Sequence, residues 1–308
     1  MTRPAGSTDE VVHVEGLWTR YRTVDVLQDV SFGVGRGELV ALLGPNGAGK
    51  TTTVEILEGF RRPSAGVVRV LDADPSQADQ AWRARTGVVL QSWRDHSRWR
   101  VREFIAYQAS FYAPYQRGPS TNVDRLLAAV GLVAQANIRI GALSGGQRRR
   151  LDLAVGIVGS PELLFLDEPT SGLDPEARRD FHDLLTETCH DTGTSVLLTT
   201  HDLEEADRLA DRLLVLVDGK MIAQGTTEEL RHEIVGPDEV RWTVGTQRFA
   251  HRTTESTAFV RSLFANEGDA IEDLEVRRAS LEDTYLELVR RAEASPSSAP
   301  EATPRSAA

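Results

Sequence analysis

The sequence predicts an α/β protein with a mixed, largely parallel sheet, an inserted helical subdomain and a small C-terminal α+β segment. Three observations support this fold class. Short apolar segments alternate with helical segments over residues 162–220, as is typical of a parallel sheet covered by helices. Residues 101–160 show helical periodicity. A glycine-rich loop, Gly44–Thr51, lies between an apolar segment and a helical one.

The individual elements follow from local patterns. Apolar and β-branched residues between turn-forming residues predict strands, and apolar residues at helical spacing predict helices. The predicted strands cover about residues 11–18, 26–34, 38–44, 67–72, 87–90, 162–169, 195–202 and 212–220. The predicted helices cover residues 50–58, several segments within 101–160, 176–191 and 203–210.

A chain of 308 residues can form one large domain and one small domain. We expect a flexible N-terminus over residues 1–10, a main domain over 11–225, and a helical subdomain within it over about 92–160. A helix over 226–235 and the short strand-like and helical segments after it predict a small C-terminal domain over 226–291. The tail, 292–308, is rich in Pro, Ala and Ser and is expected to be disordered.

Composition excludes several classes of protein. The formal net charge of −11 argues against general nucleic-acid binding. The single cysteine, Cys189, cannot form an internal disulfide and fits a reducing compartment. No apolar run approaches the ~18–20 residues that a membrane span needs, and the N-terminus lacks the apolar core of a signal peptide. We therefore expect a cytoplasmic protein whose contact with a membrane, if any, is indirect.

The loop GPNGAGKT, Gly44–Thr51, matches the phosphate-loop pattern G-x-x-x-x-G-K-[ST]. Its glycines allow backbone N–H groups to surround phosphates. Lys50 is expected to reach the β- and γ-phosphate oxygens, and the Thr51 hydroxyl to bind Mg²⁺. The residues predicted to contact the nucleotide here are Gly44, Asn46, Gly47, Gly49, Lys50, Thr51 and Thr52.

Two acids end the apolar segment LLFLDEP. Asp167, at the carboxyl end of the predicted strand, is suited to hold Mg²⁺ and its water shell. Glu168 follows directly and is placed to polarise an attacking water as a general base. An acidic strand end that caps a helix is the alternative when the pair is read alone. The phosphate loop favours the catalytic interpretation.

A second segment suited to phosphate lies about 100 residues after the first. LSGGQRRR, Leu143–Arg150, has two glycines before a predicted helix, whose N-terminal N–H groups attract anions. One chain therefore has two phosphate-type segments far apart in its sequence. The arginines Arg148–Arg150 are expected to be solvated residues on the helix face or to form salt bridges, and direct phosphate contacts are the alternative.

These motifs together resemble the ABC (ATP-binding cassette) ATPases. The segment Leu143–Gln147 matches the family's signature, and Ser171–Asp174 follows the two acids as in the family. His201 ends the strand SVLLTT, and Gln91 follows the strand GVVL. The motifs occur in the family's order over about residues 11–225. The resemblance implies the P-loop NTPase fold of an ABC cassette, ATP hydrolysis, and the cofactors ATP and Mg²⁺.

The resemblance also implies why there are two phosphate-type segments. In such ATPases two cassettes pack head to tail, and each ATP lies between the phosphate loop of one and the signature of the other. The Ser144 hydroxyl and the Gly146 N–H are then donors to the partner's γ-phosphate, beside Gly145 and Gln147. The partner is expected to be a second copy of this chain.

Further roles follow from the resemblance, residue by residue. Gln91 is expected to contact Mg²⁺ or the attacking water and to relay the nucleotide state to the helical subdomain. His201 is expected to bridge the γ-phosphate and the catalytic groups, and Asp174 to couple the two sites across the interface. The catalytic set is then Glu168, His201, Gln91 and Lys50, and the metal set is Thr51, Gln91 and Asp167.

An aromatic residue ahead of the phosphate loop is expected to stack on the adenine. Tyr21 lies where the family places this residue, and stacking contributes roughly 0.5–1.5 kcal/mol. Trp18 is the alternative, although we expect it to pack on the sheet.

The resemblance makes integral membrane permease subunits the expected partners, placing the chain on the cytoplasmic face of the membrane. The segment after Gln91 carries Trp93, Arg94, Arg98, Trp99, Arg100 and Arg102, which suggests a docking surface for an acidic permease loop. A solvated basic loop is the alternative.

The C-terminal segment Ala279–Val289 resembles the end of exporter ATPases of the ABC-2 type that move drugs, lipids or polysaccharides. Leu281, Tyr285 and Leu288 or Val289 are expected to lie on one helix face. An importer ATPase and a soluble, non-transport ABC ATPase are the alternatives. One cassette, one cysteine and no heptad arms argue against the soluble class.

Overall fold

The computed structural model describes residues 10–90, 96–115, 121–234, 238–253 and 255–277, with positions 282, 285, 286 and 288–290. The chain divides into two compact units, Met1–Thr227 and Glu228–Ala308. Several predictions fall outside the described residues: the flexible N-terminus up to residue 9, Gln91, Trp93, Arg94, Leu281 and the disordered tail.

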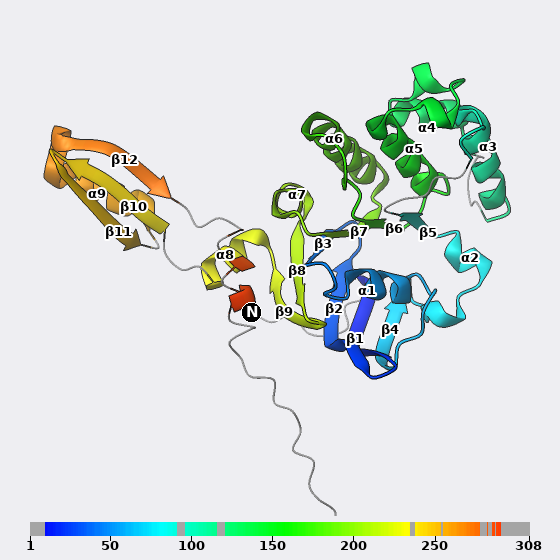
Figure 1. Ribbon diagram of the computed structural model, residues 1–308, viewed down its shortest axis with the longest axis horizontal. Helices are drawn as coiled ribbons and strands as arrows, with labels where there is room; N and C mark the ends of the chain where they lie inside the picture. The colour runs from blue at the N-terminus through cyan, green and yellow to red at the C-terminus, as the bar shows by residue number, and fades with distance from the viewer. Residues whose placement is uncertain are drawn as a thin grey trace, which may run out of the picture. The chain divides into compact units, whose positions relative to one another are not determined.

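The first unit contains two sheets and their covering helices (Figure 1). Its strands are β1 (Glu10–Tyr21), β2 (Val24–Gly35), β3 (Leu39–Leu43), β4 (Ala65–Val70), β5 (Thr86–Val89), β6 (Leu163–Asp167), β7 (Ser195–Thr200), β8 (Arg212–Val217) and β9 (Lys220–Gly225). Its helices are α1 (Lys50–Leu57), α2 (Gln80–Arg83), α3 (Val101–Tyr112), α4 (Val123–Ala129), α5 (Gly145–Ile157), α6 (Pro175–Thr192) and α7 (Leu203–Leu209), and α8 (Thr227–Ile234) crosses the boundary between the units.

The central sheet has the strand order β5-β6-β7-β3-β8-β9. All neighbours pair in parallel except β8 and β9, which are antiparallel. Every residue of β3 and β7 is buried, because helices and the second sheet cover both faces of the central strands. The mixed α/β fold class is confirmed. The carboxyl ends of β3, β6 and β7 share one edge, where the candidate site lies.

The first two predicted strands are not part of the central sheet. β1, β2 and β4 form a separate antiparallel sheet with the order β2-β1-β4. Only the residues Arg22 and Thr23 separate β1 from β2, and such a short turn joins antiparallel strands, because parallel neighbours need a longer crossover. The sequence pattern predicts these strands but does not assign them to a second sheet.

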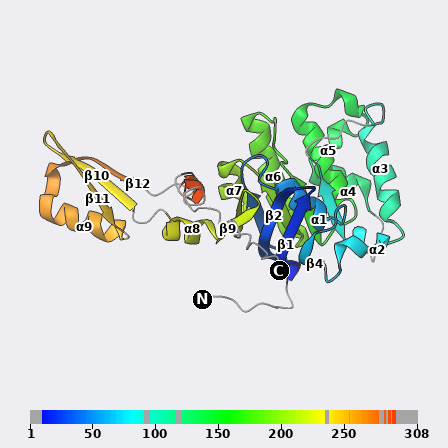
Figure 2. The ribbon, with the colours of Figure 1, turned by 60° about the horizontal axis from the view of Figure 1, so that its bottom comes forward.

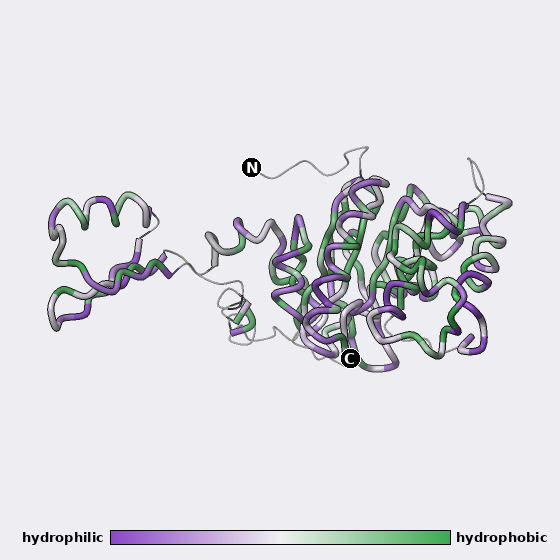
Figure 3. The backbone as a smooth tube through the Cα atoms, turned by 90° about the horizontal axis from the view of Figure 1, so that it is seen from above, coloured by the Kyte–Doolittle hydropathy of each residue, from purple (hydrophilic) through white to green (hydrophobic). Residues whose placement is uncertain are grey.

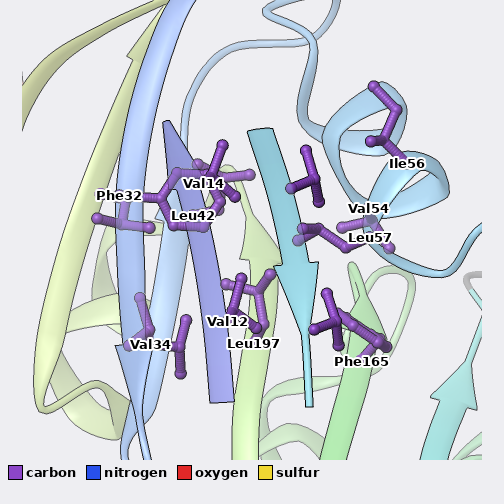
Figure 4. Packing of buried hydrophobic residues seen from close by; sticks show 14 of the residues in the cluster. Val12, Val14, Phe32, Val34, Leu42, Val54, Ile56, Leu57, Phe165 and Leu197 are labelled. Carbon is purple, nitrogen blue, oxygen red and sulfur yellow. The ribbon is translucent and has the colours of Figure 1, made fainter. Parts of the chain in front are cut away.

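A single apolar core joins the two sheets. Val12 and Phe32 from the antiparallel sheet, Leu57 from α1, and Leu42 and Phe165 from the central sheet belong to one buried cluster (Figure 4). Helix α1 therefore has apolar contacts with both sheets. This packing fixes the start of α1, and with it the loop that precedes the helix.

The helical subdomain contains α3, α4 and α5, which lie together at one end of the first unit (Figures 1 and 2). Val101, Phe104 and Ile105 form the buried face of α3. Figure 3 shows apolar segments of the chain, in green, running through the first unit between hydrophilic ones. None of the described helices is long and apolar enough to cross a membrane.

The second unit contains a three-stranded antiparallel sheet with the order β11-β10-β12. Its elements are β10 (Asp238–Val244), β11 (Gln247–Thr253), α9 (Ser256–Glu267) and β12 (Ile271–Arg277). Trp242 of β10 packs against Phe249 of β11 and Phe259 of α9, with ring centroids 5.5 and 5.7 Å away. These aromatic contacts join the sheet to α9, and Val240 and Leu263 are buried in the same unit.

Candidate functional site

The loop Gly44–Gly49 connects the carboxyl end of β3 to the N-terminus of α1. Two of its glycines are required by close contacts. A Cβ on Gly44 would lie 2.2 Å from the Leu216 carbonyl oxygen. Gly49 has φ +107°, and a Cβ there would lie 2.7 Å from the Leu27 side chain. Asn46 and Gly47 are exposed at the tip of the loop. The first N–H groups of α1 point toward the loop, as at any helix start. Gly49 provides no side-chain cap, so no side chain at that position occupies these donors.

Lys50 is buried at the start of α1, with 6% of its surface exposed. Its ammonium donates to the carbonyl oxygens of Gly44 at 2.7 Å and Pro45 at 3.2 Å, and lies 3.6 Å from the Glu168 carboxylate. Burial lowers the pKa of Lys50, and the negative charge of Glu168 opposes this shift. Thr51 is exposed and Thr52 is half-buried in the first turn of the same helix.

Asp167 ends β6 beside the loop, as the sequence predicts. The hydroxyl of Thr199, on the adjacent strand β7, donates to Asp167 Oδ1 at 2.5 Å. Thr199 is fully buried, and its Oγ1 also accepts the Glu168 N–H at 3.1 Å. Thr199 therefore orients both acids. Sequence reasoning missed it because a threonine in an apolar strand carries no signal until the strand order brings β6 next to β7.

Glu168 turns the chain sharply as it leaves β6. Its φ is +44°, in the left-handed region that a residue with a side chain occupies only under constraint. Its Oε1 lies 3.2 Å from Nδ1 of His201 as well as 3.6 Å from Lys50. The structure thus brings together three of the four residues predicted to be catalytic. Gln91, the fourth, lies outside the described residues.

A buried acid lies near Asp167. Burial raises the pKa of Glu58 to about 8, and the charges of Asp167 and Glu55 contribute to this rise. Glu58 is therefore mostly protonated at neutral pH and adds little negative charge beside the predicted metal ligand.

Tyr21 and Trp18 are equally exposed near the end of β1, each at 37%. Their exposed fractions therefore do not distinguish Trp18 from Tyr21. The two differ in their surroundings, since the Arg61 guanidinium lies 4.4 Å from the Tyr21 ring centroid and donates to Glu55 at 2.8 Å. A cation over one face leaves the other ring face for stacking on a base.

The signature segment begins helix α5 with a capping box. Ser144 Oγ accepts the Gln147 N–H at 3.3 Å, and Gln147 Oε1 accepts the Ser144 N–H at 3.1 Å. The Ser144 hydroxyl proton is not used in this cap, so it is available to an acceptor. Gly145 and Gly146 occupy the first positions of the helix, where N–H groups have no intrahelical partner.

A hollow of about 610 Å³ opens beside this helix start. Its lining comprises Gly131, Gln135, Ser144, Gly145, Gly146, Gln147, Arg150, Gly172, Leu173, Asp174, Glu176, Ala177 and Asp180. Asp174 also caps α6, accepting the N–H groups of Glu176 and Ala177 at 3.1 and 2.9 Å. In the described part of the chain, no residue of the loop 44–52 lines the hollow. One chain therefore holds two phosphate-type surfaces that do not meet within it.

The three arginines after the signature differ from one another. Arg148 pairs with Asp152 at 3.2 Å, and Arg150 pairs with Asp180 at 2.8 Å, as the salt-bridge interpretation predicts. Arg149 also pairs with Asp152, at 3.6 Å, but with 6% of its surface exposed it is not a solvated residue. The reason is the helix geometry, since Arg149 lies on the face of α5 that points at the central sheet rather than outward.

The arrangement can hold an anion and act on it. Backbone N–H groups of a helix start and one ammonium are available to bind phosphates, and a carboxylate held by Lys50 and His201 is available to accept a proton. A small cavity of about 90 Å³, lined in part by Glu168 and His201, adjoins the carboxylate. The geometry suits hydrolysis of a phosphoanhydride.

Comparison with known proteins agrees with this chemistry. Residues 27–171 match the ABC transporter domain family. The chain is 38% identical over 297 residues to the Nod factor export ATP-binding protein I of Neorhizobium galegae, covering 91% of this chain and 85% of that protein. It is 36% identical over 290 residues to a fluoroquinolones export ATP-binding protein of Mycobacterium tuberculosis, covering 92% and 94% of the two chains.

Solved structures share the fold. The structure of an ATP-binding subunit of an ABC transporter superposes with a TM-score of 0.67 at 24% identity, covering 91% of this chain and 99% of that one. The cbiO1 protein of Clostridium perfringens, described as part of the ABC transporter complex cbiONQ, superposes with a TM-score of 0.64 at 28% identity, covering 73% and 92%.

Proposed function

The chain belongs to the ABC transporter family, as an ATP-binding subunit that hydrolyses ATP to power transport, and from this membership we propose that it drives an exporter. One observation carries the residue assignment below: the Glu168 carboxylate lies 3.2 Å from His201 and 3.6 Å from Lys50, at the end of the phosphate loop.

ATP binds with its phosphates in the loop Gly44–Gly49 and at the start of α1. Lys50 exchanges its bonds to the Gly44 and Pro45 carbonyl oxygens for phosphate oxygens, which offer it stronger, charge-assisted hydrogen bonds. The adenine stacks on the face of Tyr21 opposite Arg61.

Mg²⁺ fits the oxygen donors present. The exposed Thr51 hydroxyl and the Asp167 carboxylate are hard ligands, and Mg²⁺ in nucleotide sites uses one or two protein oxygens plus phosphates and water. Thr199 donates to Asp167 Oδ1, which fixes the orientation of this carboxylate. The ion would neutralise charge on the β- and γ-phosphates.

Glu168 accepts the proton of the attacking water. His201 and Lys50 hold the carboxylate in place, at 3.2 and 3.6 Å. His201, half exposed at the end of β7, contacts the γ-phosphate when ATP is bound. Gln91 completes the catalytic set.

The second phosphate surface serves a second copy of this chain. Ser144 and the N–H of Gly146 bind the γ-phosphate of the partner's ATP, and Asp174 couples the two sites. The support for this arrangement is the separation of the hollow from the loop 44–52 within one chain. In a head-to-tail homodimer, the phosphate loop of each copy faces the signature surface of the other, and two complete sites form.

The direction of transport is outward in this proposal. Both relatives described above are named for export, and the chain is similar to them over about nine-tenths of its length. The two relatives are named for different cargoes, and their sequence identities to this chain are nearly equal. No cargo is therefore assigned to this chain. The chain acts on the cytoplasmic face of the membrane, where ATP is available.

The helical subdomain offers a docking surface for the permease. Trp99, just before α3, and Tyr107 and Phe111 on α3 form an exposed aromatic row, with successive ring centroids 5.0 and 4.8 Å apart. Arg98 is exposed beside the row, whereas Arg100 bonds to the Asn137 carbonyl and Arg102 pairs with Asp124 at 2.5 Å. We therefore assign the docking to Arg98 and the row rather than to Arg100 and Arg102, and Arg94 lies outside the described residues.

Affinity purification tests the transporter assignment. We expect the tagged chain, purified from gently solubilised native membranes, to recover a polytopic permease identified by mass spectrometry. A permease of an export class supports the proposed direction, and one of an import class contradicts it. Recovery of soluble partners alone contradicts the transporter assignment for this chain.

The same experiment tests the aromatic row. Phe111→Glu places a charge in the row and is expected to reduce permease recovery at least fivefold, because the interface would have to bury that charge. Phe264→Glu is the matched control, since Phe264 is 49% exposed and Phe111 is 54% exposed, and Phe264 lies in α9 of the second unit. ATPase activity of both isolated variants should match the wild type. Equal recovery by both variants argues against docking at this row.

A further inference from the structure

Arg149 lies at the junction between the signature helix and the edge of the central sheet. It is two positions after Gln147 on α5, and 6% of its surface is exposed. A buried guanidinium is costly unless its donors find acceptors and its charge finds a partner. Asp152, 3.6 Å away on the same helix, supplies the charge. The donors are directed elsewhere.

Three backbone carbonyl oxygens accept these donors. Nη1 donates to Leu90 at 2.7 Å, Nη2 donates to Glu168 at 3.4 Å, and Nε donates to Pro169. Leu90 directly precedes Gln91, and Glu168 and Pro169 directly follow β6. One side chain therefore joins α5 to the two strand ends that carry Gln91 and Glu168.

The contact with Glu168 coincides with its constrained backbone. A φ of +44° persists in a residue with a side chain only where the surroundings hold it. Thr199 holds the N–H side of this turn, with its Oγ1 and its carbonyl oxygen each 3.1 Å from the Glu168 nitrogen. Arg149 holds the carbonyl side, at Glu168 and Pro169. The two residues clamp the turn from opposite sides.

We propose that Arg149 is a positioning residue for hydrolysis, which fixes the turn of Glu168 and links it to the helix that binds the partner's nucleotide. The inference rests on the proposed composite site. When the partner's γ-phosphate binds at the start of α5, the Arg149 side chain transmits the position of this helix to the Glu168 turn. Binding of the partner's nucleotide at the signature is then coupled to the placement of Glu168 as the general base.

The neighbouring arginines cannot take over this role. Arg148 pairs with Asp152 on α5, and Arg150 pairs with Asp180 on α6. A lysine at position 149 keeps the charge but has one nitrogen, so it cannot reach three carbonyl oxygens in a fixed fork. Lysine substitution thus separates the charge of Arg149 from its geometry.

The experiment compares Arg149→Gln with Glu168→Gln in the full chain. For each we would measure ATPase kinetics, the Kd of ATP, and the molar mass by light scattering with and without Mg-ATP. We expect Arg149→Gln to lower kcat at least tenfold, to change the Kd less than threefold, and to accumulate an ATP-bound dimer as Glu168→Gln does. Arg149→Lys should behave in the same way despite its retained charge.

Arg212→Gln is the control for loss of a partly buried guanidinium. Arg212 also joins a backbone carbonyl, of Gly33, and a carboxylate, of Glu38, away from the site. Its loss should lower the melting temperature and leave kcat within twofold of the wild type.

The outcomes separate this inference from the function on which it rests. If Glu168→Gln itself forms no ATP-dependent dimer, the composite site is wrong. If Glu168→Gln dimerises while Arg149→Gln loses activity without dimerising, Arg149 serves the signature surface alone and the positioning role is overturned. Unchanged kcat in both Arg149 variants overturns it as well. Should Arg149→Gln fail to fold, the kcat and dimerisation of Arg149→Lys decide between the same outcomes.

Discussion

Replacing Glu168 by Gln is expected to abolish ATP turnover while leaving ATP binding intact. Glutamine keeps the size of the side chain and its contacts with His201 and Lys50, but it cannot accept a proton from water. Removing a general base typically costs about 10²–10⁴ in rate. We expect kcat to fall by at least two orders of magnitude and the Kd of ATP to change less than threefold.

The same substitution should stabilise the proposed closed dimer, in which ATP holds two copies together until it is hydrolysed. Light scattering with saturating Mg-ATP is expected to report twice the mass of one chain. The unsubstituted chain at the same concentration, after it has consumed its ATP, is the control and should return to the nucleotide-free mass. A Glu168→Gln chain that remains monomeric with bound ATP contradicts the composite site.

Lys50→Met is expected to weaken ATP binding itself. Methionine has nearly the same length and fits the buried position, but it removes the ammonium that faces the loop. Hydrogen bonds to charged groups contribute roughly 1.5–3 kcal/mol, and about 1.4 kcal/mol corresponds to tenfold in affinity. We therefore expect the Kd of ATP to rise about 10- to 100-fold, with loss of hydrolysis.

The chain provides a matched control, because its only other lysine is Lys220. Lys220 is exposed at the start of β9, so Lys220→Met removes the same charge from a solvated position. Isothermal titration of both variants measures the difference. An ATP affinity for Lys50→Met within threefold of that for Lys220→Met would show that Lys50 does not bind phosphate.

The fold class and the family could be predicted from the sequence because their signals are local. A phosphate loop is recognisable from eight consecutive residues, and the alternation of apolar and helical segments predicts the central sheet. The helix predicted after the signature glycines and the helix predicted over 176–191 are present as α5 and α6, and Ser144 and Asp174 cap them.

The residues that the sequence did not single out depend on tertiary neighbours. Thr199 matters only because β7 lies next to β6, and strand order cannot be read from one strand's residues. Arg149 looked like its neighbours Arg148 and Arg150 in the sequence. A rotation of about 100° per residue along α5 buries Arg149 and leaves the other two on more accessible faces.

In the proposed dimer, each ATP site joins the phosphate loop of one copy to the signature of another. Two inactive variants test it when mixed. Lys50→Met disables the loop, and Gly145→Asp brings a negative charge to the start of α5, where a Cβ has room, with the nearest atom 3.8 Å away on Leu173. In a mixed dimer, one site carries both defects and the other carries neither.

The measurement is ATPase activity of the two variants alone and mixed in equal amounts. We predict almost no activity from either variant alone and a clear recovery in the mixture, toward a quarter of the wild-type rate if dimers form at random and sites act independently. Activity in the mixture no greater than the sum of the separate variants contradicts a site shared between two copies.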